Sequence, residues 1–347
     1  MAAMSRGFAR LLILIALSAV AIAVVLYLTV DERTSEALLN VDPKYLLLFL
    51  SIWITALALD AVSIVLFTRG TEERIGFFTA LKTTTLRIFF NIVTPFGFGG
   101  QPFAIVSLNR EGIPTGKGSS IVIMKLVTLS AFTQTGAIVS FLLYQRQIQT
   151  MRFLTTVFLI AGSVGVVFMV LLIVGFLYPH FLVRSLTAIG RLLHSVRIVK
   201  STENLKRRII HEAVVARRSF RHYFSHHLTY FIGGTFFNGL SYLAQLVLLW
   251  AILYGLGIVI PFGDALVLAA ILLFLIMFMP TPGAIGFGEA FFLLLYARVI
   301  PSYLLGVALV LWRFFYHYLS AIFGAVTSSK YASEMIVRRE AQKKTAP

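Results

Sequence analysis

Long apolar segments constrain this chain more than any other feature of its sequence. Six runs, at residues 8–30, 44–67, 118–144, 153–178, 228–256 and 303–327, are each long enough to cross a hydrocarbon core about 30 Å thick as an α-helix. Of the 347 residues, 59% are hydrophobic and 13% are charged, so the chain is more apolar and less charged than soluble domains. These proportions exclude a soluble enzyme, a disordered chain and an ordinary nucleic-acid-binding domain. They predict an all-α polytopic membrane protein with about six spanning helices.

Two further apolar segments, at residues 76–113 and 262–300, are interrupted by glycine and proline. The first contains Thr94-Pro95-Phe96-Gly97-Phe98-Gly99-Gly100-Gln101-Pro102, and the second contains Thr281-Pro282-Gly283-Ala284-Ile285-Gly286-Phe287-Gly288-Glu289. The apolar arm that follows each interruption has only about 11 residues, which cover about half of the core. We therefore expect two re-entrant helical hairpins, and the alternative is a kinked full span.

The two interrupted segments align with each other without a gap. Thr94-Pro95 falls on Thr281-Pro282, Gly99 on Gly286, and Ile113-Pro114 on Ile300-Pro301, while Lys125 pairs with Arg313 one residue out of phase. Three predicted crossings separate the hairpins, so the hairpins would enter the membrane from opposite faces. This is the arrangement of inverted-repeat transporters, in which broken helices meet at a central binding site.

The distribution of charge predicts the orientation of the chain. Lys and Arg number 30 against 14 Asp and Glu, a formal net charge of +16, and the basic residues gather near the N-terminus, in residues 180–227 and in the tail 331–347. The positive-inside rule places these regions and both termini in the cytoplasm, with the chain in the cell (inner) membrane. Residues 1–330 then form one transmembrane domain, in which residues 180–227 are a basic amphipathic segment on the inner surface.

Polar residues near the two interruptions are the candidate site. The second arm of each hairpin begins near its glycines, where free N–H groups and the positive end of the helix dipole attract anions. The candidate substrate-binding residues are Gly99, Gly100, Gln101, Gly286, Gly288 and Glu289, together with the intramembrane Arg87, Asn91, Lys125 and Arg313. Thr94, Pro95, Pro102, Thr281 and Pro282 would shape the hairpins.

Ion pairing is the structural alternative for several of these groups. Glu289 and Asp60 are candidates for proton or ion coupling, but either carboxylate could instead pair with a cation. Arg313 paired with Glu289 is one such arrangement, and Lys125 could be paired or could extend toward the membrane surface.

Cofactor motifs are not recognisable in the sequence. Gly97-Phe98-Gly99-Gly100 lacks the strand–turn–helix context of a dinucleotide site, and the spacing of His222, His226 and His227 supplies only one of the histidine boxes that a di-iron membrane enzyme needs. We therefore expect no cofactor, no metal site and no nucleic-acid partner. With no cysteine, disulfides are excluded.

The two motifs together resemble those of a known family. The runs Thr94-Pro95…Gly99-Gly100-Gln101-Pro102…Arg110-Glu111-Gly112-Ile113-Pro114 and Pro280-Thr281-Pro282-Gly283-Ala284-Ile285-Gly286…Glu289 are similar to those of the lysylphosphatidylglycerol synthase transmembrane region. This is the flippase-like domain of multiple peptide resistance factor proteins and their stand-alone relatives. Arg313, after Trp312, fits the second motif, whereas Lys125 stands where the family often has Arg and Ala104 where a polar residue is common.

The resemblance implies translocation of a polar lipid between leaflets. The aminoacyl-transferase domain that follows in fused relatives is absent from this sequence, so the chain is not expected to be an enzyme. The expected substrate is an anionic or aminoacylated phospholipid or a polyisoprenyl-phosphate lipid, which would pass through a central electropositive cavity. Membrane lipids are then the partners, and a homodimer or a separate lipid-modifying enzyme stays open. Two other functions remain as alternatives: a secondary transporter of a small soluble anion, and a non-transporting subunit of a lipid-modifying complex.

Overall fold

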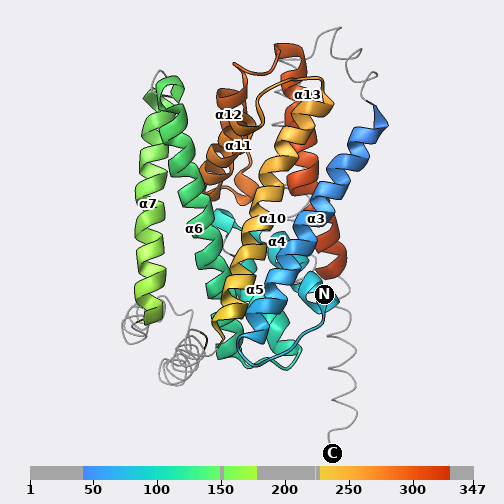
Figure 1. Cartoon of the computed structure of the whole chain (residues 1–347), viewed down its shortest axis with the longest axis vertical. Helices are drawn as coiled ribbons and strands as arrows, with labels where there is room; N and C mark the ends of the chain where they lie inside the picture. The colour runs from blue at the N-terminus through green and yellow to red at the C-terminus, as the bar shows by residue number, and fades with distance from the viewer. Residues whose placement is uncertain (1–41, 98, 149–151, 178–222, 224–226, 329–347) are drawn as a thin grey trace, which may run out of the picture.

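The computed structural model describes residues 42–97, 99–148, 152–177, 223 and 227–328. The predicted helix 8–30, nearly all of the basic segment 180–227 and the tail 331–347 lie outside the described residues. The described elements are α3 (Pro43–Arg69), α4 (Phe77–Val93), η1 (Pro95–Gly97), α5 (Gly100–Arg110), α6 (Thr115–Ile148), α7 (Arg152–Leu177), α10 (Leu228–Gly255), α11 (Phe262–Met277), η2 (Pro282–Ala284), α12 (Phe287–Tyr296), α13 (Ser302–Arg313) and the π-helical turn η3 (Phe314–Tyr318) (Figure 1). The prediction of an all-α fold is confirmed for this part of the chain, which contains no strand.

Four of the helices are long and apolar enough to cross a membrane. They are Pro43–Arg69, Thr115–Leu143, Leu228–Gly255 and Ser302–Ser328, and each overlaps one of the predicted spans. The predicted span 153–178 corresponds to α7, whose shorter stretch Thr155–Leu171 is also apolar. The chain is therefore a multi-pass helical membrane protein, while the total number of crossings stays a prediction.

α3 and α10 cross the centre of the bundle side by side and run in opposite directions (Figure 1). Near the start of α10, Gly234 lies against Phe67 at the end of α3, and at the other end Gly255 lies against Phe49. Midway between them, the Ser241 hydroxyl donates to the Ala56 carbonyl over 2.8 Å. Small residues thus let two apolar helices approach closely, as is common between membrane helices.

α3 begins at a capped N-terminus. The Asp42 carboxylate accepts the Lys44 backbone N–H over 2.9 Å, and this bond holds the pKa of Asp42 below its usual range. Pro43 occupies the first helical position, where the missing N–H has no intrahelical partner to lose.

Both interrupted segments fold into helical hairpins. α4 packs on α5, α11 packs on α12, and the turns η1 and η2 at the two tips are in contact. Figure 1 shows α4 and α5 in the lower part of the bundle and α11 and α12 in its upper part. The hairpins therefore approach each other from opposite ends and meet inside the molecule.

The two tips have the same backbone conformation at their first aligned positions and differ at the aligned glycines, where φ is −65° at Gly99 and 84° at Gly286. Thr94 and Thr281 are extended, and each is followed by a proline that opens a 3-10 turn. The next residues, Phe96 in the first tip and Gly283 in the second, both adopt positive φ, at 57° and 61°. The helices that follow also begin at aligned residues, because α5 and α12 start at Gly100 and Phe287, and α6 and α13 start at Thr115 and Ser302.

Candidate functional site

A buried cluster of three charged side chains joins α3, α4 and α6. Asp60, Arg87 and Lys125 are 6%, 7% and 4% exposed. The Asp60 carboxylate lies 2.8 Å from the Lys125 ammonium and 3.0 Å from Nη2 of Arg87, and it also accepts the Thr84 hydroxyl over 2.8 Å. Asp60 is thus fully used as an acceptor, and ion pairing, the alternative considered for it, is confirmed.

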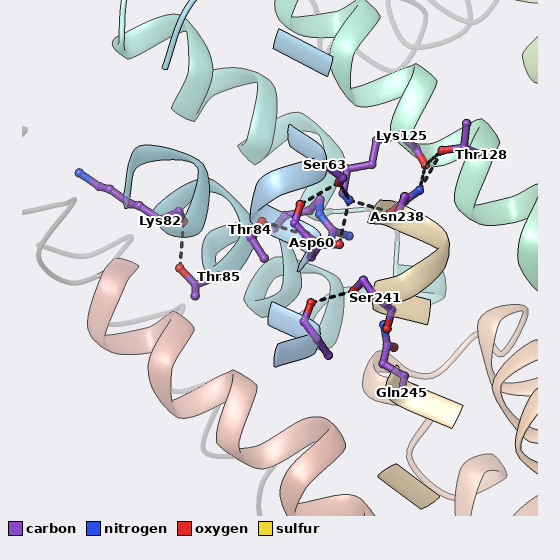
Figure 2. A network of polar contacts seen from close by, with 12 residues as sticks. Asp60, Ser63, Lys82, Thr84, Thr85, Lys125, Thr128, Asn238, Ser241 and Gln245 are labelled. Atoms are coloured by element: carbon purple, nitrogen blue, oxygen red, sulfur yellow. Dashed lines mark hydrogen bonds and ion pairs between the residues drawn. The ribbon is translucent and has the colours of Figure 1, made fainter. Parts of the chain in front are cut away.

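The surroundings of Lys125 fit a charged ammonium group. Its three donors reach Asp60, the Ser63 hydroxyl at 2.7 Å and Oδ1 of Asn238 at 2.8 Å (Figure 2). The Ser63 hydroxyl donates to the Asp60 carbonyl, and the Asn238 amide nitrogen donates to Thr128 and to the Lys125 carbonyl, so both groups present oxygen to the ammonium. Three acceptors matched to three N–H donors stabilise the protonated form.

A second buried ion pair holds the other hairpin. The Arg313 guanidinium is completely buried and lies 2.8 Å from the Glu289 carboxylate. Its Nη1 and Nη2 also donate to the carbonyls of Gly283 and Ala284, at 3.0 and 3.1 Å. Glu289 in turn accepts the Gly286 N–H over 2.7 Å. The pairing of Arg313 with Glu289, considered as the structural alternative for these residues, is present, and the pair fixes tip η2 to the start of α12.

A cavity of about 560 Å³ lies between the two hairpin tips and the central helices. Most of its lining is apolar, with contributions from α3, α4, α6, α7, α10 and α11. Its polar and aromatic lining includes Trp53, Asp60, Arg87, Asn91, Gln101, Thr133, Ser241, Tyr242, Gln245, Thr281, Tyr316, His317 and Ser320. An apolar chamber with a few converging polar groups is the usual form of a small-molecule or lipid site.

The cavity brings together only some of the predicted site residues. Arg87, Asn91, Gln101, Asp60 and Thr281 line it. Lys125 is not part of the lining, but its ion-pair partner Asp60 is. Gly99, Gly100, Gly286, Gly288, Glu289 and Arg313 are not part of the lining either.

The glycines at the hairpin tips already have partners within the chain. The Gly99 N–H donates to the Thr94 hydroxyl and the Gly100 N–H to Oδ1 of Asn91, each over 2.9 Å. That these amides hold a lipid head group stays a prediction. To bind one, they would have to give up their hydrogen bonds to Thr94 and Asn91. A Cβ at Gly100 would collide with Asn91, and one at Gly288 would collide with Arg313, so both glycines allow close packing.

Sequence reasoning did not find three of the residues that define the cavity. Tyr242, Tyr316 and His317 line it, and His317 lies 3.2 Å from Nη1 of Arg313. Tyr316 and His317 belong to the π-helical turn η3, a departure from regular helix that is frequent at functional sites. In an apolar aromatic-rich helix, no local signal separates such residues from ordinary core.

Asn238 was also missed, although an amide in the middle of an apolar span is a signal that could have found it.

As for metals, no group of three or more His, Asp or Glu side chains that could hold an ion occurs in the part of the chain that the structure describes.

Fold and site together define a polytopic helical membrane protein in which two broken helices meet at an internal cavity that the buried Asp60 and Arg87 line. The family model of the lysylphosphatidylglycerol synthase TM region matches residues 11–324, and the chain belongs to this family. It is also similar to a UPF0104 membrane protein of Archaeoglobus fulgidus, with 25% identity over 291 residues that cover 81% of this chain and 83% of the relative. Family membership indicates a role connected with membrane lipids.

Proposed function

We propose that this protein translocates a polar lipid between the leaflets of the cell membrane. The observation that carries the proposal is the cavity itself, which combines an apolar lining with the paired Asp60–Arg87 group at its wall. A lipid head group needs polar partners within the membrane, while its acyl chains can stay in apolar surroundings. Membership in a lipid-related membrane family supports the same function.

The two hairpins give the proposal a mechanism. We propose that they are re-entrant halves of an inverted repeat and that their touching tips separate the two ends of the cavity. Matching conformations at the start of the two tips, aligned helix starts and approach from opposite ends support this arrangement. The head group would pass between the tips near Gln101 and Thr281, with both termini of the chain in the cytoplasm.

The substrate under this proposal leaves the site chemically unchanged. The carboxylates near the cavity are engaged, Asp60 by two cations and Glu289 by Arg313, and we assign them to positioning. A separate enzyme would modify the lipid, and the protein would act without a cofactor.

Translocation in proteoliposomes tests the function. Purified protein is reconstituted with a trace of fluorescently labelled phosphatidylglycerol, and an impermeant quencher reports the label that reaches the outer leaflet. We expect exchange between leaflets to be faster than in protein-free liposomes. A monodisperse, correctly folded preparation that moves no more label than empty liposomes would contradict the proposal.

A further inference from the structure

The charged side chains buried in the described part of the bundle do not balance. Arg87, Lys125 and Arg313 are cationic, whereas Asp60 and Glu289 are the buried carboxylates. Arg313 and Glu289 neutralise each other, but Asp60 is shared by Arg87 and Lys125. One positive charge is therefore left over at the Asp60 cluster. An uncompensated charge in a low-dielectric interior is unfavourable, so the cluster gains stability from an anion.

The unused donor of this cluster belongs to Arg87, which of its two cations is the one that lines the cavity. Lys125 has three acceptors for its three donors and does not line the cavity. Arg87 does line it, and its hydrogen bonds to described residues all leave from Nη2. Nε of Arg87 is buried and has no hydrogen-bond partner there. A guanidinium N–H without a partner is suited to a phosphate oxygen, with which it forms a charge-assisted hydrogen bond.

A second unpartnered donor lines the same cavity from α10. Tyr242 is 8% exposed, and its hydroxyl has no hydrogen-bond partner among the residues that the structure covers. Tyr316, from the π-helical turn η3, lines the same cavity as Arg87 and Tyr242. Buried donors without acceptors are costly, and an incoming acceptor group removes that cost.

We propose that Arg87 and Tyr242 bind the phosphate of a lipid whose head group carries net negative charge. The proposal rests on the lipid-translocation function and narrows its substrate to anionic phospholipids or polyprenyl phosphates. A lysyl ester adds two ammonium groups to phosphatidylglycerol and makes the head group cationic. The surplus positive charge of the Asp60 cluster therefore repels it. The site therefore discriminates against the aminoacylated lipid.

The test compares labelled lipids in proteoliposomes of the full chain. The probes are phosphatidylglycerol, its lysyl ester and zwitterionic phosphatidylcholine, and we expect phosphatidylglycerol to move at least about tenfold faster than the lysyl ester. Tyr242→Phe removes one hydroxyl and keeps the ring, and it should slow phosphatidylglycerol about five- to tenfold. Tyr296→Phe is the matched control, because Tyr296 is buried outside the cavity and its loss of a hydroxyl should leave the rate unchanged. Arg87→Lys keeps the charge but loses Nε, and we expect a loss at least as large as that of Tyr242→Phe.

Each contrary outcome has a different meaning. Equal or faster movement of the lysyl ester would overturn the anionic selectivity and leave the translocation function intact. If none of the three lipids moves, the proposed function itself fails. Uptake of radiolabelled glycerol phosphate without lipid movement would assign the phosphate site to a soluble anion and overturn its assignment to a lipid.

Discussion

Asp60 on α3 is the ion-pair partner that Arg87 on α4 and Lys125 on α6 share. Its carboxylate neutralises two cations, so Asp60→Asn leaves Arg87 and Lys125 buried next to each other without a counter-charge. We expect a loss of about 3–5 kcal/mol in the free energy of unfolding. Lys125→Met should cost less, because Asp60 keeps Arg87 as its partner.

Unfolding midpoints in detergent micelles show whether Asp60→Asn loses more stability than Lys125→Met. Glu73→Gln is the control, because it breaks the partly exposed Lys117–Glu73 pair and should cost no more than about 1 kcal/mol. Equal losses for Asp60→Asn and Glu73→Gln would mean that the buried cluster does not stabilise the fold.

Gly288 is a residue at which the absence of a side chain is required. A Cβ there would collide with the Arg313 guanidinium and displace it from Glu289 and from the carbonyls of tip η2. Gly288→Ala should therefore lower the free energy of unfolding by about 1–3 kcal/mol.

Gly162→Ala makes the same change in α7, where a Cβ meets nothing within 4 Å. That control should be neutral, or stabilising by up to about 1 kcal/mol through helix propensity. Thermal unfolding of the two variants separates the effects, and a neutral Gly288→Ala would show that Arg313 is not held as described.

At the scale of elements, each hairpin tip is held by side chains that cap its backbone. Thr94→Val removes the acceptor of the Gly99 N–H and should cost about 1–3 kcal/mol, with faster hydrogen exchange in a peptide that covers residues 95–102. Thr55→Val is the matched control, because the exposed Thr55 hydroxyl donates to a carbonyl within its own helix. Unchanged exchange at the tip in Thr94→Val would contradict the capping role.

The hairpins and a central cavity could be predicted from sequence, whereas the composition of the charged cluster and the lining of the cavity could not. Thr94-Pro95 and Thr281-Pro282 are local signals, since proline ends a helix wherever the chain folds. A single intramembrane carboxylate also predicts an ion pair, as Asp60 shows. That Asp60 has two partners depends on how closely α3, α4 and α6 approach each other, and this distance is set by packing along the whole bundle. Tyr242 and His317 become cavity residues for the same reason.

At the scale of the whole molecule, the inverted arrangement predicts which loops share a face of the membrane. A re-entrant first hairpin puts Arg74 and Glu111, which flank it, on one face, and a re-entrant second hairpin puts Val259 and Ala297 on the opposite face. Because the chain has no cysteine, a single cysteine at each of these exposed positions can be labelled in intact cells with an impermeant maleimide.

We expect cysteines at Arg74 and Glu111 to be labelled from one side of the membrane. Cysteines at Val259 and Ala297 should be labelled from the other side. If Arg74→Cys and Glu111→Cys are labelled from different sides, the first segment is a kinked full span and the inverted-repeat proposal is wrong.

The central claim is that lipid passes through the cavity, and blocking that cavity tests the claim most directly. Ala244 lines it, while the neighbouring Leu243 on α10 is exposed and does not. Ala244→Cys and Leu243→Cys are reconstituted with labelled phosphatidylglycerol, and the leaflet exchange rate is measured before and after reaction with a bulky thiol reagent. We predict that modification at residue 244 stops translocation and that modification at residue 243 does not. Stoichiometric modification at residue 244 with an unchanged rate would contradict passage through the cavity.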